Sequence, residues 1–418
     1  MKRAILICIV ATMAFPLFAQ QYDGEGFYRI KNRGEAGRYI SIENDKVSEE
    51  SKKISFSGGK SVSANMEALK TVRNKDYVPG TIIYISGKSS ELTLEAQGMN
   101  TDELLEKFGY SGYKLKANSR GELNTTYSGY QLDLIDFGYD YPVKKDAFCA
   151  VATLNFISTN SISSYALWDL IKIDNNNEFF GIYPNENVKI GDKYYTTLFT
   201  SFAYQLREGM KAYYIDQHIY DTDHVQEPIA ELKEITDGII PAATPIIIEC
   251  ASNSVSSNKV TLLSENHSPI TGNELKGRVF CFIPGEREDQ DMKNALAFNE
   301  STMRVLGVKD GKLAMVADNY TALKEITKSN GEKERYIPAN KAYLPISSSD
   351  AAATANGIKL LLPDEYAVAT SISRVVSEET PIKEGIYTLT GVKVKEDDDT
   401  NNLPYGIYII NGKKQVIR

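Results

Sequence analysis

The stretch IPAATPIIIE, residues 240–249, decides the fold class of this chain. A proline stands at the entrance of an apolar, β-branched run, where its missing N–H costs a sheet no hydrogen bond. The same device returns 97 residues later in IPANKAYL, residues 337–344. Alternating runs at 194–199 and 210–215 precede the first copy. Strands at this spacing predict an antiparallel β-sandwich over residues 188–368.

Short alternating runs extend the β pattern toward the amino terminus, across residues 21–187. Three stretches interrupt it with helical spacing: one capped by Ser63 with Met66, Leu69 and Val72 on one face, one at 101–109, and one at 146–156. The whole chain is therefore expected to be mainly β, and its amino-terminal domain to carry short helical insertions.

Two pairs of runs in this domain resemble a known repeat. GFYRIKN at 26–32, followed by GRYIS at 37–41, is similar to the opening repeat of ricin-type β-trefoil lectin domains. ALWDL at 166–170 and FFGI at 179–182 resemble a second, partial copy. The resemblance implies a β-trefoil-like domain over 21–187. It does not by itself imply lectin activity, because one fold hosts many functions.

The predicted sandwich also resembles a known domain. The stretches 193–202, 209–214, 239–249, 303–307 and 337–345 are similar to a sandwich domain of many uncharacterised secreted Bacteroidales proteins. This resemblance implies export and a position at the cell surface or toward a host. It implies no activity, because the matching residues are those of strands and turns.

The carboxyl-terminal part is predicted to contain a linker at 369–380 and a small hairpin module at 381–418. Two similar hairpins turn at Thr390-Gly391 and Asn411-Gly412, and the second is a favoured two-residue hairpin dipeptide. The module resembles the closing half of C-terminal sorting domains of the type IX secretion system, which implies the secretion machinery as a partner. A structural cap on the sandwich is the alternative.

Residues 1–19 have the pattern of a cleaved signal peptide. Lys2 and Arg3 precede an apolar run that ends near Ala19, and this run is too short for a retained spanning helix. The sequence therefore predicts a secreted or outer-surface protein without a transmembrane segment after cleavage. With 47 basic against 55 acidic side chains, no basic excess favours nucleic acid as a partner.

Potential metal ligands and thiols are few, since the chain has three histidines and four cysteines. The densest set of potential metal ligands lies within twelve residues and consists of Asp216, His218, Asp221, Asp223, His224 and Glu227. These residues form either a metal site or a solvated hairpin loop that binds no metal. Export also permits a disulfide between Cys250 and Cys281. Both cysteines lie in apolar runs, so the alternative is that each is an unbridged, small buried residue of a strand. No cofactor is expected.

One cluster combines aromatic faces with carboxylates in a turn-rich stretch, the combination that binds sugars: Tyr127, Tyr130, Asp136, Tyr139, Asp140 and Tyr141. No histidine or cysteine lies in a recognisable nucleophile setting. The sequence therefore predicts a non-catalytic protein that binds a polysaccharide or a host glycoprotein. The alternatives are a purely structural surface protein and a glycan hydrolase, which needs only two carboxylates.

Overall fold

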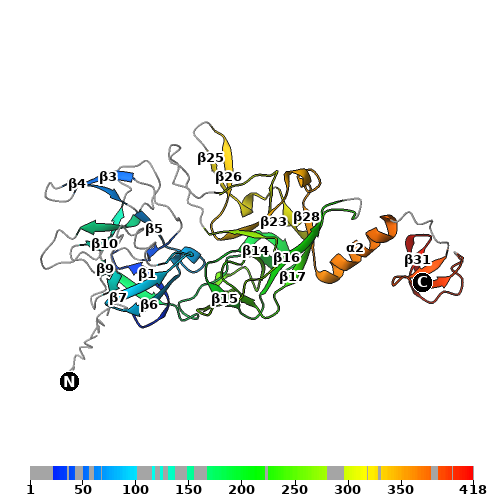
Figure 1. The fold of residues 1–418 in the computed structure, drawn as a ribbon, viewed down its shortest axis with the longest axis horizontal. Helices are drawn as coiled ribbons and strands as arrows, with labels where there is room; N and C mark the ends of the chain where they lie inside the picture. Colours follow the sequence, from blue (N-terminus) through cyan, green and yellow to red (C-terminus); the bar gives the residue numbers. More distant parts are fainter. Residues whose placement is uncertain are drawn as a thin grey trace, which may run out of the picture. The chain divides into compact units, whose positions relative to one another are not determined.

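The computed structural model is mainly β, as predicted, and divides into two compact units, Met1–Glu178 and Phe179–Arg418 (Figure 1). The division falls before the predicted boundary at 187/188, which would cut strand β13 (Asn185–Ile190) of the second unit. The structure describes residues 22–34, 37–42, 50–55, 61–66, 68–100, 115–117, 123–125, 130–136, 148–154, 167–221, 225–279, 296–317, 319–327, 331–377, 385–397 and 399–417.

The first unit contains a ten-stranded sheet that returns to its first strand. Tyr28 of β1 pairs with Lys172 of β12 and with Ile83 of β6. The last strand in the order, β6, therefore pairs with β1, and the sheet closes on itself. The strands of this unit are β1 (Gly26–Asn32), β2 (Tyr39–Ile40), β3 (Glu50–Ser55), β4 (Ser61–Met66), β5 (Ala68–Val72), β6 (Ile83–Lys88), β7 (Glu91–Glu95), β8 (Leu115–Ala117), β9 (Leu123–Thr125), β10 (Tyr130–Asp136), β11 (Phe148–Leu154) and β12 (Trp168–Lys172).

Two of the three predicted helical insertions are wrong, because their residues form strands. The stretch from Ser63 to Val72 lies in β4 and β5, and the stretch 146–156 contains β11. β11 pairs with β10 along seven residue pairs and with β5 on its other edge. This tertiary pairing outweighs the local helical spacing. The third predicted helix, at 101–109, lies outside the described residues.

A buried arginine ties separate loops of the first unit together. The guanidinium of Arg29 donates to Glu178 Oε2 at 3.2 Å and to Thr81 Oγ1 at 3.1 Å, and its side chain is fully buried. Lys75 Nζ lies 2.6 Å from the same carboxylate oxygen. Burial lowers the pKa of Arg29, while Glu178 favours the charged form. The network therefore compensates a buried charge and fixes the last residue of this unit.

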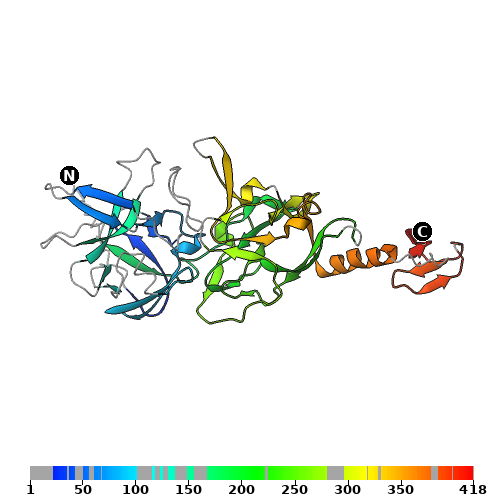
Figure 2. The same cartoon turned by 45° about the horizontal axis from the view of Figure 1, so that its top comes forward.

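The second unit is built around another ten-stranded sheet, curled about one core (Figure 2). The two layers expected of a sandwich are therefore parts of one sheet, which is antiparallel except between β17 and β28. Its strands, in spatial order, are β13 (Asn185–Ile190), β14 (Lys193–Leu198), β19 (Ile246–Cys250), β16 (Lys211–Ile219), β17 (Ile229–Glu234), β28 (Ile358–Leu361), β24 (Lys312–Val316), β23 (Met303–Lys309), β27 (Lys341–Pro345) and β21 (Lys276–Arg278).

Smaller elements complete this unit. One three-stranded sheet has the order β18 (Ile239–Ile240), β15 (Ala203–Leu206) and β20 (Val260–Leu263). A second has the order β22 (Leu296–Ala297), β26 (Lys333–Ile337) and β25 (Lys324–Thr327). The short 3-10 helices of the described chain are η1 (Pro79–Thr81), η4 (Val255–Ser257), η5 (Tyr320–Ala322) and η6 (Ser348–Asp350).

The core of the curled sheet follows from the alternation of its strands. Ile247 of β19 is fully buried, with Tyr213 and Ile215 of β16 beside it in the same apolar cluster. Leu306 of β23 and Met315 of β24 belong to the same cluster, although they lie far along the sheet. A sheet buries side chains from distant strands in this way only when it curls.

The two ends of the curled sheet meet at a seam between β14 and β27. Phe199, directly after β14, donates its N–H to Asn340 O at 2.9 Å, and Asn340 Nδ2 donates back to Phe199 O at 3.0 Å. The N–H of Ala342 donates to Thr197 Oγ1 at 3.2 Å. On β21, a Cβ added to Gly277 would lie 2.0 Å from the Phe199 ring, so close packing requires glycine there.

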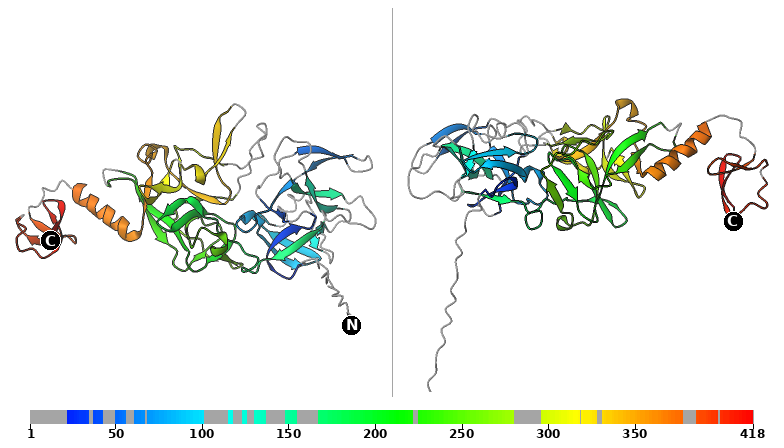
Figure 3. Two further views of the ribbon diagram at one scale, coloured as in Figure 1. Left: turned by 180° about the vertical axis from the view of Figure 1, so that it is seen from behind. Right: turned by 60° about the horizontal axis from the view of Figure 1, so that its bottom comes forward.

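Helix α2 (Pro363–Ser377) runs through most of the predicted linker at 369–380 (Figure 3). The first turns of α2 pack Tyr366 against Ile229 and Leu361, and Asp364 and Glu365 occupy its first turn. Acidic side chains there favour the helix through its dipole. No helix of the described chain is both long enough and apolar enough to cross a membrane.

The carboxyl-terminal module is a four-stranded sheet of order β30-β29-β31-β32. Asn411 and Gly412 both have positive φ, 51° and 73°, as expected for the two-residue hairpin turn. Ile386, Tyr408 and Ile410 form its small apolar core. The strands are β29 (Ile386–Thr388), β30 (Lys393–Lys395), β31 (Gly406–Ile410) and β32 (Lys413–Ile417).

Candidate functional site

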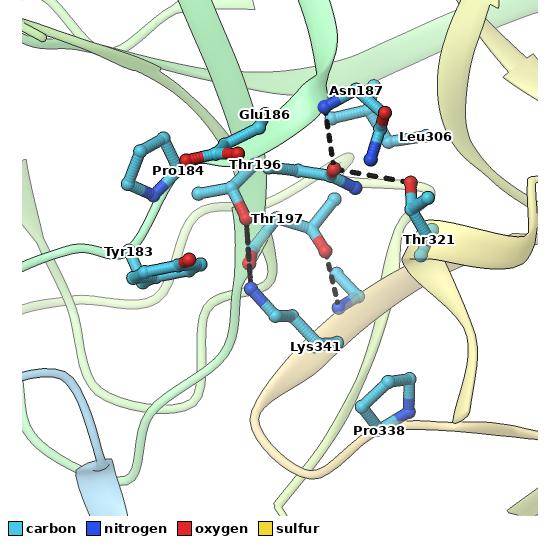
Figure 4. A pocket seen from close by; sticks show the side chains of 13 residues that line it. Tyr183, Pro184, Glu186, Asn187, Thr196, Thr197, Leu306, Thr321, Pro338 and Lys341 are labelled. Carbon is cyan, nitrogen blue, oxygen red and sulfur yellow. Dashed lines mark hydrogen bonds between the residues drawn. The ribbon is translucent and has the colours of Figure 1, made fainter. Parts of the chain in front are cut away.

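A cavity of about 300 Å³ lies at the seam of the second unit (Figure 4). The segment around β13, from Tyr183 to Asn187, supplies one wall. Thr196 and Thr197 of β14 and Lys341 of β27 supply another, and Thr321 of η5 contributes as well. The closure of the curled sheet therefore brings together residues that are 145 positions apart in the sequence, such as Thr196 and Lys341.

Lys341 is the cation of this cavity. Its Nζ donates to Thr196 Oγ1 at 2.9 Å and to Thr197 O at 3.1 Å, two contacts across the seam (Figure 4). Among the described residues it forms no ion pair, in contrast to Lys309 and Lys359, which both contact Glu227. An ammonium group out of water without a counter-ion is unfavourable.

The surroundings of Lys341 weaken its hold on the proton. Burial lowers the pKa of Lys341 from its ordinary 10.5 to about 8, and the smaller influence of Cys250 acts in the opposite direction. Desolvation disfavours the charged form of an amine, which is the physical cause of this direction. A titratable group perturbed in this way inside a cavity is a candidate functional residue.

Neutral polar groups line the rest of the cavity. Asn185 Oδ1 accepts from Thr321 Oγ1 at 3.2 Å, which joins η5 to β13, and from the N–H of Asn187 at 3.1 Å, which lies within β13 (Figure 4). Tyr183 is 48% exposed and offers an aromatic surface. Among the described residues of the lining, Glu186 supplies the one carboxylate, and it is exposed.

The six residues of the predicted sugar-binding cluster are only partly described. Tyr130 and Asp136 stand at the two ends of β10, paired with Leu154 and Phe148. A strand rises about 3.3 Å per residue, so these two positions are roughly 20 Å apart. The remaining members lie outside the described residues: Tyr127, Tyr139, Asp140 and Tyr141. Sugar binding by this cluster stays a prediction.

The predicted metal ligands make other contacts where they are described. Asp216 Oδ2 accepts from Lys233 Nζ at 3.2 Å, and His218 Nδ1 lies 2.6 Å from Glu274 Oε2. Glu227 contacts two lysines, and Asp221 is exposed. The described part of the chain holds no group of three potential ligands. Asp223 and His224 lie outside the described residues, so the metal site stays a prediction.

Cys250 on β19 is fully buried and forms no disulfide with another described residue. Burial is the main cause that raises its pKa to about 12, with Lys341 acting in the opposite direction and Glu249 adding to the rise. A thiolate, not a thiol, is the reactive nucleophile. Its predicted disulfide partner Cys281 lies outside the described residues, so the bridge stays a prediction.

Cys250 should therefore resist alkylation by iodoacetamide at pH 8 in the native protein. Unfolding followed by a second, heavier label should mark Cys250 with the second label only, as read by peptide mass spectrometry. Modification of Cys250 in the native state would contradict its burial. A Cys250 that takes the second label only after reduction would instead establish a disulfide, and a non-reduced peptide that joins Cys250 to Cys281 would identify the predicted bridge.

The fold and the cavity together define a β-rich protein with a small polar pocket, and the lysine of this pocket forms no ion pair with another described residue. Comparison of the chain with protein-family models, with curated proteins and with solved structures found no match.

The sequence carried almost no signal for this pocket. Lys341 stands in the run that marks a strand, and Thr196 and Thr197 stand in another, so each reads as an alternating sheet residue. The one usable signal is YPNEN at 183–187, where an aromatic ring, two amides and a carboxylate lie close together at the start of β13. Which strand would face it depends on the closure of the sheet.

Proposed function

We propose that this chain is an exported, non-catalytic protein that binds a glycan or glycoprotein at the cell surface, and that the Lys341 cavity is its binding site. The proposal includes export through residues 1–19 and contact of residues 381–418 with a secretion machinery, as the sequence resemblances imply. It rests chiefly on one observation, a polar cavity beside an exposed tyrosine.

The composition of the lining supports a sugar as the ligand. Amide and hydroxyl groups such as those of Asn187 and Thr321 match the hydroxyl groups of a pyranose, and a ring such as that of Tyr183 packs against its C–H face. The volume of about 300 Å³ is at the lower end of the range for small-ligand sites. One sugar unit at the end or branch of a chain fits this size.

The same lining gives less support to a glycan hydrolase. Glycoside hydrolysis requires two carboxylates on opposite sides of the scissile bond. Glu186 has no second carboxylate opposite it among the described residues of the cavity. The proposal is therefore one of binding without turnover.

Tyr183→Ala should weaken glycan binding by about tenfold, because an aromatic contact with a ligand contributes about 0.5–1.5 kcal/mol beyond its buried area. The measurement is a glycan array with the purified protein, followed by titration calorimetry with the strongest binder. Tyr405→Ala is the matched control, since Tyr405 is 85% exposed and lies in the carboxyl-terminal module.

Equal loss in both tyrosine variants would point to a general surface effect and would contradict this assignment. If no glycan on the array is retained by the unaltered protein, the proposed function is wrong.

A further inference from the structure

We infer that the Lys341 cavity selects an acidic sugar, and that the ammonium group of Lys341 receives the carboxylate of that sugar. This inference rests on the proposed function and specifies its ligand.

The amine of Lys341 has more hydrogen-bond donors than its described partners use. A lysine ammonium has three N–H donors. Two of them are used on Thr196 Oγ1 and Thr197 O, and neither acceptor is an anion. One donor and the whole positive charge therefore have no partner among the described residues.

The positive charge of Lys341 is held against a buried wall of the cavity, made by Thr196 and Thr197. Thr196 and Thr197 are 3% and 7% exposed, so the wall behind the amine excludes water. Seam contacts through Asn340 and Ala342 fix the backbone on both sides of Lys341. An amine held so firmly has little freedom to turn toward solvent, and an arriving anion gains most where the cation is already desolvated and positioned.

The size and the lining of the cavity favour the carboxylate of a sugar over a bare anion. The cavity is larger than a carboxylate or a sulfate alone, and its other walls are neutral polar groups and the Tyr183 ring. A bare anion would leave the Asn187 side chain and the Tyr183 ring without a contact to the ligand. A hexuronate or a sialic acid has one carboxylate for the amine and several hydroxyl groups for these side chains.

Glu186 supplies an internal test of the charge argument. Its exposed carboxylate lines the same cavity and forms no ion pair with Lys341. It repels an approaching anion through solvent, an effect that salt screens. Removing its charge should therefore strengthen the binding of an acidic sugar, whereas removing the charge of Lys341 should weaken it.

The experiment is titration calorimetry at low salt with glucuronate, galacturonate and N-acetylneuraminate, and with glucose and galactose as the neutral counterparts. Lys341→Met should lower the affinity for the preferred acidic sugar by about tenfold or more, the loss expected for one charge-assisted contact. Glu186→Gln should raise it by roughly twofold to fivefold. Lys312→Met, an exposed lysine outside the cavity, should leave it unchanged.

The affinity should also fall as the pH rises above about 8, because the amine of Lys341 loses its proton in that range. This pH dependence should be absent from Lys341→Met. Circular dichroism and the melting temperature of each variant establish that a loss of binding is not a loss of fold.

The outcomes separate the two levels of the proposal. Equal affinity for glucose and glucuronate would overturn the inference and leave the proposed function standing. Binding of sodium sulfate or acetate as tightly as the uronates would also overturn it, because the cavity would then be a simple anion site. Opposite shifts in Lys341→Met and Glu186→Gln, for acidic sugars only, would support it.

Discussion

Arg304→Met should lower the free energy of unfolding of the second unit by about 3–5 kcal/mol, because several buried hydrogen bonds from one charged donor group are lost together. Arg304 is 1% exposed and stands near the start of β23. Its guanidinium donates to Thr354 O at 3.1 Å, Thr354 Oγ1 at 2.7 Å and Ala351 O at 3.0 Å, and also to the carbonyl oxygens of Met303 and Glu300.

The physical reason is the number of acceptors left behind. Methionine fills a similar length but donates nothing, so the carbonyl oxygens of Ala351, Met303 and Glu300 would lose this donor, and Thr354 O would keep only the N–H of Gly357. Chemical denaturation should report the loss, and heating should lower the melting temperature by roughly 10 °C. Lys312→Met, at an exposed pair 3.8 Å long, is the control and should change stability by less than about 0.5 kcal/mol. A loss below about 1 kcal/mol at Arg304 would contradict the network.

Lys341→Met should have the opposite sign and raise the free energy of unfolding at pH 7 by about 1–2 kcal/mol. A lysine whose pKa falls from 10.5 to about 8 holds its charge in the folded state at a cost of about 3 kcal/mol. Loss of the hydrogen bonds to Thr196 and Thr197 offsets part of this gain, at about 1 kcal/mol each.

The pH dependence of this gain follows from linkage. Below pH 8 both the folded and the unfolded protein bind the proton of Lys341, and the cost of the buried charge is fully present. Between pH 8 and 10.5 the unfolded state binds more of this proton, so the stability of the unaltered protein rises with pH. The advantage of Lys341→Met should therefore shrink across this range in urea titrations. An advantage that stays constant, or a variant less stable at pH 7, would show that the charge is already compensated.

Arg304 and Lys341 differ in the partners of their charged groups, and this difference indicates a structural role for Arg304 and a binding role for Lys341. Arg304 directs its guanidinium donors at carbonyl and hydroxyl groups of the segments 300–303 and 351–354, so it serves stability. Lys341 has one donor and its charge without a partner among the described residues, at the wall of a cavity. A residue that costs stability and remains accessible to a ligand is what a binding site requires.

The sequence predicted the class of fold because β patterns are local. Alternation over 26–32 and 246–250 and turn dipeptides such as Asn411-Gly412 each act within a few residues. The prediction that Pro241 stands at a strand entrance was wrong, because Pro241 directly follows the end of β18 and a turn separates it from β19. Helical spacing was misleading at 63–72 and 146–156, where pairing on both edges of β11 decided the outcome. The helix α2 was missed because its small and polar residues resemble a linker.

The sequence alone therefore determined that this chain is mainly β and which short segments are strands and turns, since these depend on neighbours along the chain. Only the tertiary structure decided the candidate site. Lys341 meets Thr196 and Thr197 because a ten-stranded sheet curls until its two ends touch. That contact depends on the summed twist and packing of all the intervening strands, which no single segment of sequence encodes.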